Sequence, residues 1–167
     1  MIYAIMAMDN QGGISKNGVM PWPKNSEDLQ FFKRMTQKKI IVMGSSTWNA
    51  EDMPSPLPNR VNVVATGKPA DYPEAHSTIP FPGKTLEESI RQYEASPHNE
   101  GVYIIGGARL IESTLHMIDI FYITMIEGNY ECDTFAPLDR IRNEMKFDSG
   151  TMPSDAPCVF YKYVRRN

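Results

Sequence analysis

Apolar runs alternate along the chain with segments whose apolar residues recur at helical spacing. Segments 26–37, 85–94 and 108–117 have this spacing and predict helices, and a short helix is expected after Gly44. Six runs rich in Ile, Val and Tyr predict strands, at residues 2–8, 39–43, 60–65, 102–105, 118–125 and 158–164. Several runs are apolar at consecutive positions, which is typical of strands covered on both faces of a sheet. The alternation predicts an α/β fold with a central, mostly parallel sheet and helices on both faces.

The ends of these elements carry further signals. We predict only a loop between the last two strands, which makes them an antiparallel pair at the C-terminal edge of the sheet. Asn25 or Ser26 is the expected N-cap of the first helix, and Thr85 with Glu88 has the spacing of a capping box. Three proline clusters lie between periodic segments and are predicted to be ordered loops, so we expect a single domain over residues 1–167.

Length, charge and cysteine content narrow the functional classes. The 167 residues are 41 % hydrophobic and 22 % charged, as in an ordinary soluble domain. The 17 basic and 20 acidic residues form no basic stripe, so no nucleic-acid partner is expected. The longest apolar stretch is too short to span a membrane and lacks the flanks of a signal peptide, and the two cysteines suit a reducing compartment. We therefore expect a cytoplasmic protein without a membrane partner. No metal site is expected, because His76, His98 and His116 are scattered.

The first candidate for chemistry is a carboxylate on an apolar helix face. Asp28, Phe32 and Met35 share one stripe of the predicted helix at 26–37, whereas Glu27 points about 100° away. A first-turn acid can simply favour the helix dipole. The alternative is that Asp28 binds a ligand bearing N–H donors, which would offset the cost of desolvating the carboxylate. The pattern alone leaves both interpretations open.

Two tight turns join a predicted strand to a helix. In the first, Gly106 and Gly107 precede the helix at 108–117; in the second, Gly44 precedes a hydroxyl-rich segment. Such turns let backbone N–H groups approach a phosphate, although glycine pairs also occur for steric reasons alone. Two of them in one small domain favour a nucleotide ligand.

Two further residues lie in loops and have more than one interpretation. Arg60 follows a proline-rich loop and precedes a strand, so it either grips a carboxylate with two hydrogen bonds or is a solvated surface residue. Asp133 lies in a turn, where capping backbone donors is the commoner role of an aspartate.

Taken in order, these segments resemble the dihydrofolate reductase family from Ile2 to the final strand. The most specific match is Met20-Pro21-Trp22, followed after five residues by Asp28, then by Phe32 and Thr36. Four further motifs follow in the order of the family: Gly44 with Thr47 and Trp48, Leu57-Pro58 with Arg60, Ile105-Gly106-Gly107, and Asp133-Thr134-Phe135 with Pro137.

The resemblance implies an NADPH-dependent enzyme that reduces 7,8-dihydrofolate to 5,6,7,8-tetrahydrofolate in one-carbon and thymidylate metabolism. Hydride would pass from the nicotinamide to C6, and N5 would be protonated. Asp28 would bind the 2-amino group and N3 of the pterin and would accept a hydrogen bond from Thr124. Arg60 would bind the α-carboxylate of the glutamate tail. Residues 13–24 would form a mobile lid in which Trp22 guards a water molecule, with Asp133 as its latch.

The family's site residues transfer to this chain position by position. The implied catalytic residues are Asp28, Trp22 and Thr124. The implied substrate contacts are Ile5, Ala7, Met20, Asp28, Leu29, Phe32, Leu57, Arg60, Ile105 and Thr124. The implied NADPH contacts are Ala7, Gly13, Ile14, Asn17, Gly18, Val19, Gly44, Ser45, Ser46, Thr47, Thr66, Gly67, Lys68, Ile105, Gly106, Gly107, Ala108, Arg109, Leu110 and Ile111. The Gly106–Gly107 peptide would be cis, and a monomer is expected.

The chain departs from the family pattern at a few positions. Ser15 replaces the usual glycine of the lid, and Ile111 replaces an aromatic residue often found beside the nicotinamide. Ser45 and Ser46 stand where many members carry a basic residue against the adenosine phosphates, so Lys68 and Arg109 are the candidates to supply that charge.

Two rival functions are weighed against the reductase. One is a reductase of the same fold that acts on a ribosylated pyrimidine, which has no need of Asp28 or Arg60. The other is a folate- or nucleotide-binding protein without turnover.

Overall fold

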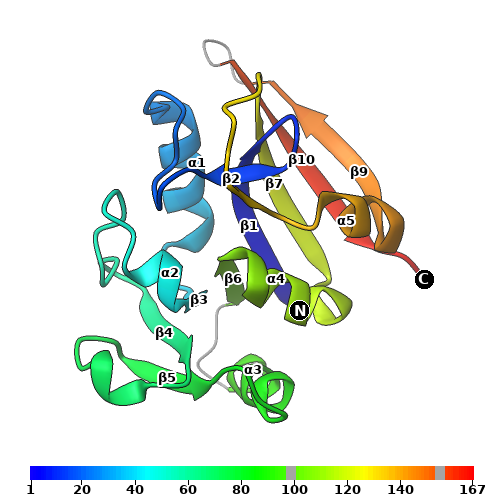
Figure 1. The fold of residues 1–167 in the computed structure, drawn as a ribbon. Coiled ribbons are helices and arrows are strands. Elements are labelled where there is room, and N and C mark those ends of the chain that lie inside the picture. The colour runs from blue at the N-terminus through cyan, green and yellow to red at the C-terminus, as the bar shows by residue number, and fades with distance from the viewer. Residues whose placement is uncertain (97–100, 153–156) are drawn as a thin grey trace.

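The computed structural model describes residues 1–96, 101–152 and 157–167, which fold around one eight-stranded sheet (Figure 1). The strand order is β5-β4-β3-β6-β1-β7-β10-β9. The strands are β1 (Ile2–Asp9), β3 (Ile40–Gly44), β4 (Val61–Thr66), β5 (Ser77–Pro80), β6 (Val102–Gly106), β7 (Ile120–Ile126), β9 (Met145–Thr151) and β10 (Cys158–Arg165). All neighbours from β5 to β7 are parallel, and β10 is antiparallel to both β7 and β9. The predicted mostly parallel sheet with an antiparallel C-terminal edge is confirmed.

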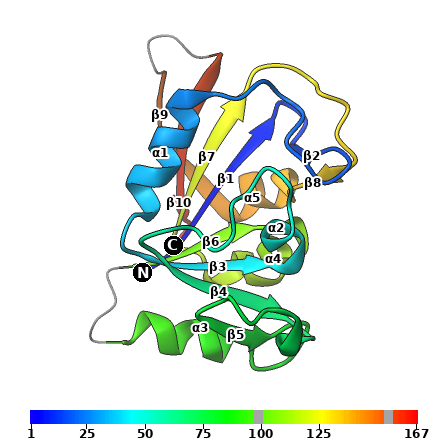
Figure 2. The same ribbon diagram turned by 90° about the vertical axis from the view of Figure 1, so that its left-hand side faces the viewer.

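The helices cover both faces of this sheet, as predicted. They are α1 (Ser26–Thr36), α2 (Ser45–Trp48), α3 (Leu86–Glu94), α4 (Ala108–Thr114) and α5 (Leu138–Glu144), with 3₁₀ turns at Pro69–Asp71 and Leu115–Met117. Side chains of α1 and α2 pack against one apolar cluster, and those of α3, α4 and α5 belong to the other. Figure 2 shows α1 in front of the long strands.

Successive residues of the parallel strands pack alternately into these two clusters. On β3, Val42 faces the cluster beneath α3, α4 and α5, whereas Ile41 and Met43 face the cluster beneath α1. On β6, Ile104 and Ile105 divide in the same way. Both faces of these strands are buried, which explains why their sequences are apolar without alternation.

The capping prediction is right for one helix and wrong for another. Asn25 is the N-cap of α1, where its extended backbone lets the Asn25 Oδ1 accept from the Asp28 N–H at 3.1 Å. Thr85 precedes α3, but its side chain makes no capping hydrogen bond. Its ψ of 1° departs from the extended conformation that aims a side-chain oxygen at the first turn, so the capping box predicted with Glu88 does not form.

The expected single loop before the last strand is also wrong. The segment contains α5, β9 and the short strand β8 (Thr134–Phe135), which pairs with β2 (Gly13–Ser15) in a second, two-stranded sheet. β9 is therefore the edge strand, although β10 does pair antiparallel with β7. Every residue of β9 after Met145 is exposed, so the strand lacks the apolar alternation that would have predicted it.

Candidate active site

The central sheet opens where β1 and β6 lie side by side. The pairing of these strands ends at Ala4 with Ile104, whereas β1 continues to pair with β7 as far as Asp9 with Ile126. After β1 the chain passes through α1 to β3, which lies on the β6 side of this opening. After β6 it passes through α4 to β7, which lies on the β1 side. Ligands of open α/β sheets bind at such a switch point, beyond the carboxyl ends of the strands.

Asp28 lies in the first turn of α1, partly buried near this opening. Thr124 on β7, which is paired in register with Ala7, places its hydroxyl near the Asp28 carboxylate, where hydrogen bonding to it lowers the pKa of that carboxyl. Burial raises the pKa of Asp28, and the Thr124 hydrogen bond opposes that rise only in part. Phe32, one turn further along α1, packs against the apolar cluster on this face. A desolvated carboxylate with a strand hydroxyl beside it agrees with a ligand-binding role better than with a helix-dipole role alone.

Arg60 is buried, with only 8 % of its surface exposed. Its Nε donates to the Pro58 carbonyl at 2.9 Å and its Nη1 donates to Thr36 Oγ1 at 3.1 Å. Burial lowers the pKa of Arg60, and none of the ion pairs found in the described ranges involves it. A desolvated guanidinium held by neutral acceptors is suited to bind a ligand carboxylate.

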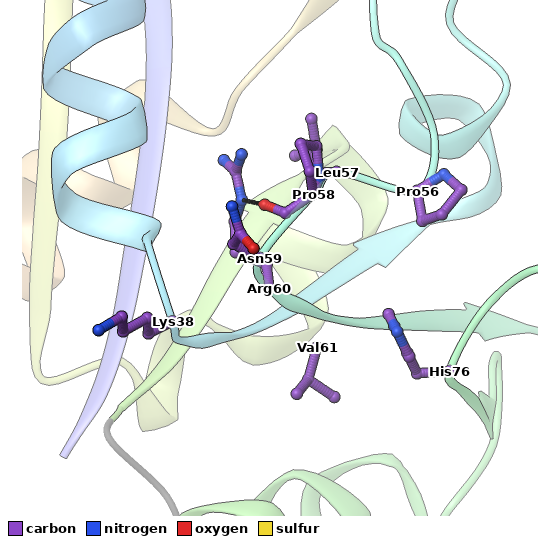
Figure 3. Close-up of a pocket in the computed structure, with 8 residues that line it drawn as sticks. All are labelled: Lys38, Pro56, Leu57, Pro58, Asn59, Arg60, Val61 and His76. Atoms are coloured by element: carbon purple, nitrogen blue, oxygen red, sulfur yellow. Dashed lines mark hydrogen bonds between the residues drawn. The ribbon is translucent and has the colours of Figure 1, made fainter.

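A cavity of about 400 Å³ adjoins Arg60 (Figure 3). It is lined by Lys38, Pro56, Leu57, Pro58, Asn59, Arg60, Val61 and His76. In Figure 3 the Arg60 guanidinium points away from Val61, toward Leu57 and Pro58.

The sequence did not single out Asn62, which shapes this loop. Asn62 is fully buried, and its side chain accepts from the Leu57 N–H and donates to the Leu57 carbonyl, both at 2.9 Å. It also donates to the Arg60 carbonyl at 3.1 Å. The signal that could have identified it is a lone amide within the otherwise apolar strand β4.

The two glycine turns predicted to bind a nucleotide lie against each other. A Cβ on Gly107 would come within 2.9 Å of Ser46 Oγ, and a Cβ on Gly106 within 3.3 Å of Thr47 Oγ1. Gly106 also has φ of 125°, a conformation that side chains rarely adopt, and the Gly106–Gly107 peptide is cis as expected. The hydroxyl groups of α2 thus pack closely against the glycines that precede α4.

Arg109 lies over the Phe81 ring, and Lys68 is linked to Phe81 through Thr66. The Arg109 guanidinium is 5.6 Å from the centre of the Phe81 ring, and the Phe81 N–H donates to the Thr66 carbonyl at 3.2 Å. Thr66 in turn accepts from the Lys68 N–H at 3.0 Å. Both cationic side chains are exposed, so they are available to a charged ligand beyond the carboxyl ends of β4 and β6.

Residues 13–24 form a loop held over the sheet by contacts at several points. Asp133 Oδ2 accepts from the Asn17 N–H at 2.9 Å, and the Asp133 N–H donates to the Ser15 carbonyl at 3.0 Å, which is the contact expected of a latch. Trp22 is buried and packs edge-on against Tyr130, with ring centres 5.8 Å apart.

Of the remaining apolar residues expected to contact the substrate, three are buried, Ala7 is half-buried and two are exposed. Ile5, Leu57 and Ile105 belong to the apolar cluster beneath α1. Met20 and Leu29 each leave 38 % of their surface exposed. These two are the large apolar side chains that a bound ligand would cover.

Comparison with known proteins identifies the family. The family model described as dihydrofolate reductase matches residues 1–164. The chain belongs to the dihydrofolate reductase family. It is an oxidoreductase by that membership. The dihydrofolate reductase of Sus scrofa is 29 % identical over 167 residues, covering 90 % of this chain and 87 % of that protein. The type 8 dihydrofolate reductase of Escherichia coli is 29 % identical over 140 residues, covering 82 % and 80 % respectively.

A solved dihydrofolate reductase structure has the same fold. The Enterococcus faecalis dihydrofolate reductase, complexed with NADP(H) and RAB-propyl, superposes with a TM-score of 0.81 and 29 % identity. The match covers 100 % of this chain and 97 % of that one.

The described residues offer neither a metal site nor a membrane-spanning helix. Across residues 1–96, 101–152 and 157–167, His, Cys, Asp and Glu side chains form no group of three that could hold a metal ion. His98 lies outside these residues. In the same ranges no helix is long and apolar enough to cross a membrane. Cys132 and Cys158 are free and buried.

Removing the Asp133 side chain should release the lid. We expect Asp133→Ala to slow hydride transfer several-fold while the free energy of unfolding changes little, because Asp133 is exposed and its lost acceptor serves mainly the Asn17 N–H. Single-turnover absorbance after mixing with dihydrofolate measures the rate. Asp139→Ala, an exposed carboxylate on α5, is the control. An unchanged rate in Asp133→Ala would show that the latch has no kinetic role.

Proposed function

We propose that this protein reduces 7,8-dihydrofolate to 5,6,7,8-tetrahydrofolate with NADPH. The observation that carries the proposal is the partly buried Asp28, whose carboxylate lies near the Thr124 hydroxyl beside the opening between β1 and β6. When bound, NADPH supplies the hydride that reduces the pterin at C6.

In this proposal Asp28 binds and polarises the pterin ring. Its carboxylate accepts from the 2-amino group and N3, two donors that offset the cost of desolvating a charge. Negative charge at Asp28 favours protonation at N5, and the hydrogen bond from Thr124 fixes the orientation of the carboxylate. Trp22 and the lid limit the entry of water, and one guarded water delivers the proton.

The remaining substrate contacts follow the shape of the site. Side chains of Ile5, Leu29, Phe32 and Leu57 form the apolar walls, Met20 covers the opening, and Arg60 binds the glutamate α-carboxylate. Main-chain carbonyls of Ile5, Ala7 and Ile105 lie beyond the last pair of β1 with β6 and accept from the ring.

NADPH is proposed to bind along the two glycine turns and under the lid. The two turns approach closely because neither glycine has a Cβ, and this places the Ser46 and Thr47 hydroxyls beside the start of α4, where we expect a phosphate group to bind. The proposed contacts are Ala7, Gly13, Ile14, Asn17, Gly18, Val19, Gly44, Ser45, Ser46, Thr47, Thr66, Gly67, Lys68, Ile105, Gly106, Gly107, Ala108, Arg109, Leu110 and Ile111.

Lys68 and Arg109 should together determine the preference for NADPH over NADH. The double variant Lys68→Ala/Arg109→Ala is expected to raise the KM for NADPH by roughly tenfold or more and to leave the KM for NADH unchanged, because only the 2′-phosphate loses a charged partner. Parallel assays with the two cofactors measure the ratio. Lys84→Ala, an exposed lysine after β5, is the control. Equal changes in both KM values would assign the charge recognition elsewhere.

Product analysis tests the proposal. Purified protein is incubated with NADPH and dihydrofolate, and tetrahydrofolate is identified by chromatography; a ribosylated aminopyrimidine is tested in parallel. Formation of tetrahydrofolate supports the proposal. Reduction of the pyrimidine alone would favour the rival reductase, and thermal stabilisation by both ligands without product would favour a binding protein.

We further propose that residues 1–167 form one domain, that the protein is a cytoplasmic monomer, and that it has no nucleic-acid partner. The net charge of −3 without a basic stripe supports the last point.

A further inference from the structure

Asp9 is a fully buried carboxylate at the end of β1 to which the proposed mechanism gives no role. Its Oδ1 accepts from the N–H groups of Gln11 and Gly13, each at 2.9 Å. Its Oδ2 accepts from the Tyr130 N–H at 3.1 Å and from the Cys132 thiol at 3.6 Å. One oxygen therefore holds the entry to the lid, and the other holds the loop between β7 and β8.

The groups around Asp9 keep it ionised and able to accept all four hydrogen bonds. Burial alone would raise the pKa of Asp9, but the backbone N–H groups of Tyr130, Gly13 and Gln11 outweigh burial and lower it. Burial, with the nearby Asp9 charge, raises the pKa of the Cys132 thiol to about 11, so the thiol stays protonated and can donate.

Gly13 and Cys132 fit together beside this carboxylate. A Cβ placed on Gly13 would lie 2.6 Å from both Cβ and Sγ of Cys132 and 2.9 Å from Asp9 Oδ2. These separations are well below van der Waals contact, and the Cβ of Cys132 cannot move without its backbone. Gly13 is the first residue of β2. It can lie this close to the loop only because it has no side chain, as long as residue 132 has one.

The loop held by Asp9 also carries the contact to the far end of the lid. The Tyr130 ring packs edge-on against Trp22, and Cys132 belongs to the same apolar cluster as Trp22 and Cys158. Asp9 thus contacts the lid directly at Gly13 and indirectly, through Tyr130, at Trp22.

We propose that Asp9, with the complementary pair Gly13 and Cys132, is the positioning unit that closes the lid, by fixing residues 13–24 to the β7–β8 loop at Gly13 and at Trp22. Asp9 acts through Gly13 and Tyr130 and is not one of the proposed contacts of substrate or cofactor. The inference rests on the proposed function for its kinetic consequences, but its structural consequence can be measured without turnover.

Hydrogen exchange of Asp9→Asn tests the unit directly. Asparagine retains one acceptor for the lid N–H groups, but its amide presents a donor to the Tyr130 N–H. We expect peptides spanning 10–24 and 126–134 to exchange at least roughly tenfold faster, with peptides from β3 and β4 unchanged. In single turnovers, hydride transfer should fall by a similar factor while the KM for dihydrofolate changes little.

The matched control is Asp119→Asn. Asp119 Oδ2 accepts from the Ile2 N–H at 2.7 Å at the opposite end of β1, so the same substitution there removes a comparable acceptor far from the lid. Lid exchange unchanged in Asp9→Asn, or raised equally in Asp119→Asn, would overturn the proposal. If the wild-type protein shows no turnover at all, the proposed function fails while the exchange data still decide the role of Asp9.

A second pair of variants leaves Asp9 in place. Gly13→Ala should accelerate lid exchange as Asp9→Asn does, and adding Cys132→Gly should restore most of the protection because it removes both atoms at 2.6 Å. Gly83→Ala is the control, since its nearest neighbour would be 3.8 Å away. Failure of Cys132→Gly to recover any protection would contradict the pairing of Gly13 with Cys132.

Discussion

Replacing Asp28 by asparagine is expected to lower the rate of hydride transfer at neutral pH by roughly 100- to 10,000-fold. Asparagine keeps the shape and the contact with Thr124 but removes the negative charge that favours protonation at N5. The dissociation constant for NADPH should change by less than about twofold, because Asp28 does not belong to the glycine turns. Stopped-flow absorbance and cofactor fluorescence measure the two quantities. A loss of NADPH binding equal to the loss of rate would make Asp28 a structural residue.

The same variant separates the two interpretations of Asp28 through stability. Because the pKa of Asp28 is raised in the folded state, ionisation of this group opposes folding above that pKa, and the penalty disappears below the unfolded value of 3.8. Asp28→Asn should therefore unfold at the same or a higher temperature than the wild type at pH 7, and the difference should shrink as the pH falls. Glu27→Gln is the matched first-turn control. A helix-dipole role predicts the opposite, a lower Tm for Asp28→Asn.

Replacing Arg60 by alanine is expected to raise the KM for dihydrofolate by roughly 10- to 100-fold, the range for losing a hydrogen-bonded charge partner. A pterin without the glutamate tail should be reduced equally well by variant and wild type, because it has no carboxylate to lose. Steady-state kinetics on both substrates measure the difference. Arg60→Lys should give an intermediate KM, since lysine keeps the charge but not the two parallel donors.

Thr36→Val isolates the positioning of the guanidinium. It removes the hydroxyl that accepts from Arg60 Nη1 and leaves the charge in place, so a smaller rise in the same KM is expected. Equal damage to the tailed and tail-less substrates in Arg60→Ala would contradict the carboxylate role and indicate disruption of the loop that Asn62 holds.

The sequence predicted best those elements whose periodicity reflects burial. Strands β1, β3, β4 and β6 are buried on both faces, so each is a continuous apolar run that can be recognised in the sequence without knowledge of the fold. In contrast, β9 is exposed along almost its whole length, and it is held in the sheet by backbone pairing with β10 that leaves no apolar signal.

The candidate site shows the same division between local and long-range information. Asp28 could be identified because its helix places it in line with Phe32, a relation within one turn. Asp9 could not, since its importance depends on Tyr130, a partner that the fold brings near from 121 residues away. Asn62 stood in the sequence as a lone amide beside valines, but its bonds to the Leu57–Arg60 loop are seen only in the structure. The motifs of the family supplied what periodicity could not.

Isotope transfer tests the central claim most directly. NADPH carrying deuterium at the transferred position of C4 is incubated with dihydrofolate and either the wild-type protein or Asp28→Asn, and the product is analysed by NMR. We expect one deuterium at C6 of tetrahydrofolate with the wild type, and a product yield lower by about 100-fold or more at the same early time with Asp28→Asn. No deuterium at C6, from a folded protein that binds NADPH, would contradict it.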